Sequence, residues 1–272
     1  MTNQRSITLK TALTACLAAV LPVALSEAAA EPRPQNTAPK ADAPVGDAPT
    51  TVGAIHPVAV EVFLSQACPS CPPAAKLLKT LALRPDIVAL NWHVNYWDDM
   101  PTRGKGTWAD PYAHEASGNR QRTYNLRFKK RDTVFTPQII VNGVHSVRGC
   151  QEEEVNTHIN DMRTAQPDDN GPALLVEKTD QGIVATTEFG DAPYDVVLVE
   201  FKREVVTPVG GGANAGLVFD EVNIVSDVKI LATTHSGSGT FTAAAPNKDG
   251  CAVLMQAPNQ GAILAARYCD TP

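Results

Sequence analysis

The chain has 272 residues, with 23 Lys and Arg against 29 Asp and Glu and a formal net charge of −6. This length gives room for one large domain or two ordinary ones. The acidic balance argues against nucleic acid as a partner, because binding to phosphates needs a basic surface.

Residues 1–30 have the order of a secretory signal peptide. A basic start with Arg5 and Lys10 precedes an apolar stretch over 11–25, and small residues end at Ala30. No run reaches the roughly 20 apolar residues of a stable membrane span. We therefore expect a periplasmic or secreted protein, cleaved near Ala30. Residues 31–54 hold five prolines and predict a disordered Pro/Ala-rich tether.

Residues 55–167 show alternating strand and helix patterns. An apolar strand over 58–64 leads into Cys68-x-x-Cys71, a helix over 74–83 and a second strand over 87–94. A crossover of this length predicts that the two strands are parallel. A helix over 112–130 follows, then short strands over 138–141 and 144–148 around an Asn142-Gly143 turn, and a last helix after Cys150.

From residue 171 to the end, short β-rich segments recur with turn signals between them. They cover 173–178, 183–189, 195–203, 217–225, 228–235, 240–244, 251–257 and 262–269. Even spacing of this kind is typical of a sandwich. The expected fold is therefore an α/β thioredoxin-like domain followed by an all-β sandwich-like domain.

Several motifs carry a family resemblance. EVFLSQACPSCPPA, HVNYWD, RQRTYN, VFTPQIIVNG and the GANAG at 212–216 resemble a secreted bacterial thioredoxin-like family catalogued as domain of unknown function 1223, over residues 57–270. The resemblance implies that Cys68 is the nucleophile and Cys71 the resolving thiol. It also implies a cis bond between Thr136 and Pro137 beside the thiols, and it names no substrate. Asn95 stands where the family is expected to carry Asp.

The spacing of Cys68 and Cys71 favours redox chemistry or metal binding. A disulfide across two residues closes a very small loop and adds little chain-entropy stabilisation, which makes a purely structural role the weaker interpretation. Pro72 and Pro73 predict that the helix begins only at Pro73, with Cys68 further from its N-terminus. A loop of this kind also suits a soft metal such as Cu(I).

Strand directions predict the neighbours of this pair. Arg148 and Cys150 are expected to return to the sheet edge that holds the thiols, and His93 and Trp97 leave their strand at the same edge. Cys150 is then either an auxiliary thiol, a third metal ligand, or a buried inert cysteine. His93 is either a further metal ligand or a core histidine with its own partners.

Glu61 interrupts an otherwise apolar strand. Burial there raises the pKa of a carboxyl group, which suits a proton relay to Cys71. The alternative is a carboxylate held in an ion pair.

Cys251 and Cys269 flank an expected hairpin around residues 258–261. If the loop has five residues, the two cysteines face each other across the strands and form a structural disulfide.

Together these features predict an exported thiol–disulfide oxidoreductase with no cofactor other than its own redox-active disulfide. Its expected partners are protein thiols or disulfides and a redox recycling partner. The alternatives are a non-catalytic Cu(I)-binding module using Cys68, Cys71 and either Cys150 or His93, and a CxxC used only in partner binding.

Overall fold

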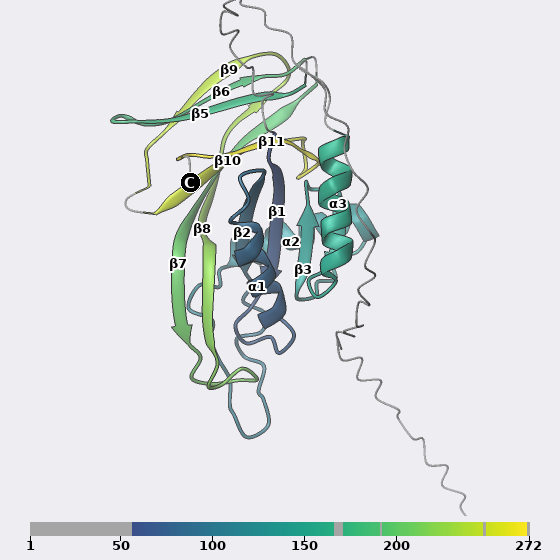
Figure 1. Ribbon diagram of the computed structural model, residues 1–272, viewed down its shortest axis with the longest axis vertical. Coiled ribbons are helices and arrows are strands. Elements are labelled where there is room, and N and C mark those ends of the chain that lie inside the picture. The colour runs from purple at the N-terminus through teal and green to yellow at the C-terminus, as the bar shows by residue number, and fades with distance from the viewer. Residues whose placement is uncertain (1–55, 166–170, 191, 247–248, 271–272) are drawn as a thin grey trace, which may run out of the picture. The chain divides into compact units, whose positions relative to one another are not determined.

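The computed structural model describes residues 56–165, 171–190, 192–246 and 249–270 (Figure 1). All of them belong to one unit that spans residues 51–272. The expected signal peptide and tether, at 1–54, lie outside the described residues. No helix in the described ranges is both long and apolar enough to cross a membrane.

The first half of the described chain alternates strands and helices. Its elements are β1 (Val58–Leu64), α1 (Pro72–Leu81), β2 (Ile87–His93), α2 (Glu115–Lys129), β3 (Gln138–Val141), β4 (His145–Arg148) and α3 (Glu152–Thr164). The rest is β-structure: β5 (Ala173–Thr179), β6 (Gly182–Glu188), β7 (Tyr194–Pro208), β8 (Val218–Thr234), β9 (Gly239–Ala243), β10 (Gly250–Gln256) and β11 (Ile263–Tyr268).

The local strand pairings of the first half agree with the sequence predictions. Strands β1 and β2 are parallel, and β3 is antiparallel to both β1 and β4. Asn142 and Gly143, in the turn between β3 and β4, have φ angles of 46° and 69°. These left-handed conformations are the ones that a tight hairpin turn requires.

The predicted combination of a thioredoxin-like domain and a separate sandwich-like domain is wrong. Strands from both halves form one mixed eight-stranded sheet in the order β11-β10-β7-β8-β2-β1-β3-β4. Strand β8 joins the halves, because it is antiparallel to β7 and pairs in parallel with β2 at Asn91 and Ile224. The remaining strands form a three-stranded sheet, β5-β6-β9.

Helices cover both faces of the sheet beside β1. Val58, Val60 and Val62 pack with the apolar residues of α1 and α3, whereas Ala59 and Phe63 face the side of Tyr124 in α2. The alternation follows from the two-residue period of a strand. Because β1 has every residue buried, it lies at the centre of this part of the fold.

Strand β8 is longer than the sequence pattern suggested. The segments expected at 217–225 and 228–235 are one strand, within which Ser226 and Leu231 are left out of the pairing with β7. Two bulges thus take the place of the expected break. Strand β8 runs the length of the β7–β8 ribbon and passes beside α1 (Figure 1).

Candidate thiol site

Cys68 and Cys71 occupy the connection between β1 and α1. The Cys71 N–H donates to the Cys68 carbonyl at 3.2 Å, and the N–H groups of Ala74 and Ala75 donate to the Cys71 carbonyl. Helix α1 begins at Pro72, so the predicted start at Pro73 is wrong. Proline is tolerated in the first turn because those N–H groups have no helical acceptor. Cys71 is therefore the N-cap, with helical angles of φ −82° and ψ −27°.

The two thiols have opposite acidities. A hydrogen bond from Cys71 lowers the pKa of Cys68 to about 6, against burial and with further help from Ser70 and Thr136. Burial raises the pKa of Cys71, and the negative charge that develops on Cys68 raises it further. Near neutral pH the pair therefore holds one thiolate and one thiol.

Ser70 and Thr136 connect the pair to the cis Thr136–Pro137 peptide bond. The Ser70 hydroxyl lies 3.3 Å from Cys68 Sγ and 3.4 Å from the Thr136 carbonyl oxygen, and its single hydrogen serves either acceptor. Trp97 Nε1 donates to Thr136 Oγ1 at 2.7 Å. Thr136, Pro137 and Trp97, all predicted from the sequence, therefore lie together beside the thiols, with Ser70 added by the structure.

A segment from the second half of the chain holds the cysteine loop in place. The side-chain amide of Asn214 donates to the carbonyl oxygens of Gln66 and Cys68, at 2.8 Å each. Gln66 in turn donates to Glu221 of β8 at 2.8 Å and accepts from Trp108 Nε1 at 3.3 Å. Gln66, Asn214 and Glu221 are all buried.

Residues 209–216 pack closely on the loop between β2 and α2. The Gly212 N–H donates to the Lys105 carbonyl at 3.0 Å. A β-carbon at Gly211 would lie 2.3 Å from the Thr107 carbonyl oxygen, so only glycine fits there. The glycines at 210–212 thus allow two loops to meet beside the thiol site.

His93 lies in a buried ion-pair network under the cysteine loop. Its Nδ1 is 2.8 Å from Asp110 Oδ2, and its Nε2 is 3.2 Å from Glu221 Oε1. Burial alone lowers the pKa of His93, but the charges of Glu221 and Asp110 outweigh it and raise the pKa to about 10. Asp110 also accepts the Gln66 N–H at 2.7 Å, which links the network to the cysteine loop.

Strand β4 returns to the thiol edge, as the strand directions predicted. The Gly149 N–H donates to the Pro137 carbonyl at 3.0 Å. A β-carbon at Gly149 would lie 2.7 Å from Pro137 Cβ and 2.8 Å from Ala74 Cβ. Arg148 and Cys150, on either side of this tight contact, are exposed, so the description of Cys150 as a buried cysteine is wrong.

Glu61 does not join the thiols, and the predicted proton relay to Cys71 is wrong. Its side chain leaves β1 on the face of α2, where Arg120 Nε donates to Oε1 at 2.6 Å and Tyr124 donates to Oε2 at 2.5 Å. Cys68 and Cys71 pack on the opposite face with α1. The alternative interpretation, an ion-paired Glu61, is the one that the structure contains.

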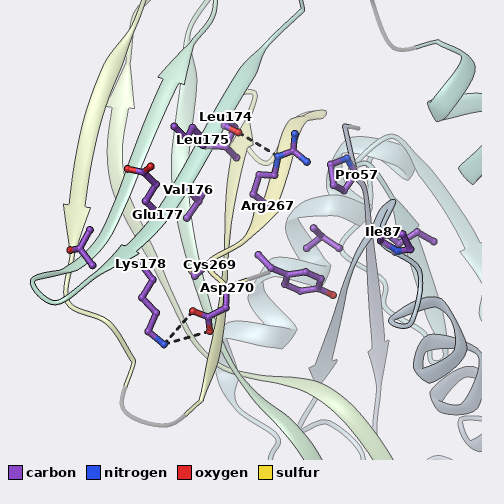
Figure 2. A pocket seen from close by; sticks show the side chains of 14 residues that line it. Pro57, Ile87, Leu174, Leu175, Val176, Glu177, Lys178, Arg267, Cys269 and Asp270 are labelled. Carbon is purple, nitrogen blue, oxygen red and sulfur yellow. Dashed lines mark hydrogen bonds and ion pairs between the residues drawn. The ribbon is translucent and has the colours of Figure 1, made fainter. Parts of the chain in front are cut away.

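Cys251 and Cys269 form a disulfide between β10 and the end of β11, with their Cα atoms 5.3 Å apart. It borders a cavity of about 920 Å³ that Leu174, Arg267 and Asp270 also line (Figure 2). Arg267 donates to the Leu174 carbonyl, and Lys178 approaches Asp270. This cavity is separate from the thiol pair, since neither Cys68 nor Cys71 lines it.

Within the described ranges, no group of three or more His, Cys, Asp or Glu side chains is placed to hold a metal ion. The His93 ring engages Asp110 and Glu221 instead of facing the cysteines. Cu(I) binding by Cys68 and Cys71 stays a prediction.

Sequence reasoning missed Ser70, Gln66, Asp110, Asn214 and Glu221. Ser70 and Gln66 could have been predicted as neighbours of the thiols, because both lie within two residues of Cys68. Asn214 stands in the GANAG motif that helped to carry the family resemblance, but the motif does not show what it contacts. Asp110 and Glu221 carry no local signal that pairs them with His93.

Residues 59–256 match the sequence profile described as "Protein of unknown function (DUF1223)". The crystal structure of protein AGR_C_4864 from Agrobacterium tumefaciens is similar, with 28% identity and a TM-score of 0.67, over 79% of this chain and 94% of that one. HBP35 of Porphyromonas gingivalis shares the fold at 13% identity and a TM-score of 0.50, over 78% of this chain and 74% of that one. No curated protein matches the chain.

Proposed function

The chain belongs to the family of proteins of unknown function DUF1223, and we propose that this member catalyses thiol–disulfide exchange, with Cys68 as nucleophile and Cys71 as resolving thiol. The observation that carries the proposal is the position of the two thiols between β1 and the N-terminus of α1, beside the cis Thr136–Pro137 peptide bond and with the Ser70 hydroxyl 3.3 Å from Cys68 Sγ. The pKa of Cys68 is lowered to about 6, while burial raises that of Cys71. An attacking thiol works best with a pKa near the ambient pH.

The surroundings of the pair support the same roles. Cys71 is the N-cap of α1, and the positive end of the helix dipole favours a nearby thiolate. Ser70 and Thr136 further lower the pKa of Cys68. The lowered pKa of Cys68 favours the thiolate near neutral pH, so the first attack needs no carboxylate relay.

The reaction proceeds in two displacements. The Cys68 thiolate attacks one sulfur of a substrate disulfide, forms a mixed disulfide and releases the first substrate thiolate. Cys71 then gives up its proton, which goes to a released thiolate, and attacks Cys68 Sγ. The second substrate thiolate leaves, the substrate has gained two electrons, and Cys68 and Cys71 are joined as a disulfide. The reverse sequence oxidises a dithiol, and a redox recycling partner sets the direction.

Access to Cys68 requires a local movement. Its relative exposure is 0%, while its neighbours Pro69 and Ser70 are exposed. The Ser70 side chain contacts both Cys68 Sγ and the Thr136 carbonyl. We expect movement of the exposed segment at 69–70 to open the sulfur to a substrate.

The setting and partners form part of the same proposal. The substrates are protein thiols or disulfides, and the reaction takes place in the periplasm or outside the cell after removal of residues 1–30. A stable disulfide between Cys251 and Cys269 suits such an oxidising compartment.

The test is to trap the mixed disulfide. In a Cys150→Ser background, which removes a second source of adducts, Cys71→Ser should accumulate a covalent adduct with a disulfide substrate, detected by intact-protein mass spectrometry. Cys68→Ser in the same background should form none, and the chain with both cysteines should release the substrate thiols. An adduct on Cys71 in the Cys68→Ser variant, or no adduct in either, would overturn the assignment.

A further inference from the structure

A groove of about 470 Å³ lies between α1 and the start of β8 and begins at Pro72, the residue after Cys71. One wall is a single face of α1, formed by Pro72, Ala75, Lys76 and Lys79. The other wall consists of residues 217–220. The groove therefore begins one residue after the thiol pair, although neither cysteine lines it.

The second wall presents apolar side chains to solvent. Leu217 is 47% exposed and Val218 is 62% exposed, whereas Phe219 between the walls is buried in the core with α1. Exposed apolar residues are common when isolated, but two adjacent ones that line a groove beside a reactive group indicate a contact surface.

The charge on the groove is positive at its thiol end. Lys79 and Asp220 neutralise each other across it, with Nζ and Oδ1 2.5 Å apart. Lys76 is exposed and takes part in no ion pair in the part of the chain that the structure describes. A ligand carboxylate near Lys76 would supply the opposite charge.

A separate cavity lies further along the helix, beyond the Lys79–Asp220 ion pair. This second cavity, of about 510 Å³, shares Lys79 with the first and is lined by Ala82, Leu83 and the β8 residues Val222 and Asn223. The two cavities follow α1 along its whole length, roughly 15 Å at 1.5 Å per residue. An extended chain covers this distance in about four or five residues, at 3.3 Å each.

We propose that this groove binds an extended polypeptide segment of the substrate next to its reacting cysteine. An apolar side chain of that segment packs on Leu217 and Val218, and a carboxylate faces Lys76. The inference rests on the proposed exchange function and adds the surface that holds the polypeptide substrate beside the thiols.

Binding is tested first without chemistry. The probe is a ten-residue peptide with Leu and Glu beside a position where Ser replaces the cysteine, and affinity is measured by calorimetry. Val218→Glu should weaken binding at least tenfold. Ile230→Glu is the matched control, because Ile230 is also in β8 and is 64% exposed, yet lines neither cavity. Equal affinities of the two variants for the peptide, or no binding to the unaltered chain at 1 mM peptide, would contradict the proposed binding in the groove.

Charge reversal gives a second, independent readout. Lys76→Glu should weaken binding of the peptide that contains Glu. A peptide with Lys in place of this Glu should recover at least part of the lost affinity. Failure of the recovery would contradict the assigned carboxylate contact.

Exchange kinetics then separate the two proposals. The ratio of the rate with the cysteine-containing peptide disulfide to that with bis(2-hydroxyethyl) disulfide should fall at least tenfold in Val218→Glu and stay constant in Ile230→Glu. An unchanged ratio in Val218→Glu would contradict substrate binding in the groove, but it would not contradict the exchange function. Peptide binding without any exchange would refute the function and leave the groove as a binding surface.

Discussion

The side-chain amide of Asn214 donates a hydrogen bond to the carbonyl oxygen of Cys68, 146 positions earlier in the chain. The same amide donates to the Gln66 carbonyl, so one side chain fixes the segment that leads into the nucleophile. The second half of the molecule thus forms part of the thiol site.

Replacing Asn214 with Leu should lower the free energy of unfolding by about 1–3 kcal/mol, because the buried Gln66 carbonyl loses a donor. The Cys68 carbonyl keeps the N–H of Cys71. Alkylation of Cys68 should also become faster as its loop loosens. Urea unfolding and timed iodoacetamide labelling measure the two effects. Asn119→Leu, at an exposed site on α2, is the control, and equal labelling rates in both variants would contradict the role of Asn214.

Ser70→Ala should move the alkylation profile of Cys68 upward from its midpoint near pH 6. Losing a hydrogen bond to a charged acceptor costs about 1.5 kcal/mol, which corresponds to about one pH unit. The labelling rate of Cys68 is followed from pH 4 to 9. The exposed Ser236 provides the matched Ser→Ala control, and a midpoint that stays near 6 in Ser70→Ala would contradict the contact.

The charge on His93 should make stability depend on alkaline pH. Because the folded pKa of about 10 lies above the ordinary value of 6.5, the stabilisation is complete below pH 6.5 and is lost as the pH rises through 10. The difference in free energy of unfolding between the unaltered chain and His93→Gln should therefore shrink from pH 6 to 10.5. A constant difference would show that His93 is uncharged in the folded protein.

Glu61→Gln should destabilise the fold by about 3–5 kcal/mol, because it leaves the buried Arg120 guanidinium without its charged partner. Since Glu61 lies on the opposite face from the thiols, the alkylation midpoint of Cys68 should stay near pH 6. Glu204→Gln, at an exposed site, should change stability by less than about 0.5 kcal/mol. A shifted alkylation midpoint of Cys68 in Glu61→Gln would instead support the proton-relay hypothesis.

Removing the disulfide with Cys251→Ala and Cys269→Ala together should cost about 3 kcal/mol, the value expected for a loop of this size. Denaturant unfolding with and without reductant checks the origin of the loss. Reductant should lower the free energy of unfolding of the unaltered chain and leave that of the double variant unchanged. Equal stability of the two proteins under oxidising conditions would contradict the stabilising role.

Local pattern was sufficient for much of the thiol edge. The apolar period, the Asn142-Gly143 turn and the strand directions placed Trp97, Arg148 and Cys150 at this edge, because each is fixed within a few residues or by strand direction. The cis bond at Pro137 was implied by the family resemblance and not by local pattern. The prediction of a proton relay through Glu61 was wrong for a physical reason. When every residue of a strand is buried, alternation between apolar and polar positions disappears, and the sequence no longer shows which face Glu61 occupies.

Local sequence patterns could not predict that both halves of the chain form one large sheet. Strands β2 and β8 meet through residues as distant as Asn91 and Ile224, and neither strand carries a local mark of its partner. A break was expected at 226–227, between two strand segments, whereas Ser226 forms a bulge within the continuous β8. The same long-range pairing places Glu221 beside His93, so the missed fold and the missed ion pair have one cause.

The late position of Asn214 has a consequence for how the protein is made. Residue 68 leaves the ribosome long before the segment that fixes its loop has been synthesised, and the buried partner Glu221 comes later still. The nascent chain therefore carries Cys68 without the contacts that later enclose it. Formation of the β7–β8 ribbon brings Asn214 and Glu221 to the cysteine loop and ends this exposed period.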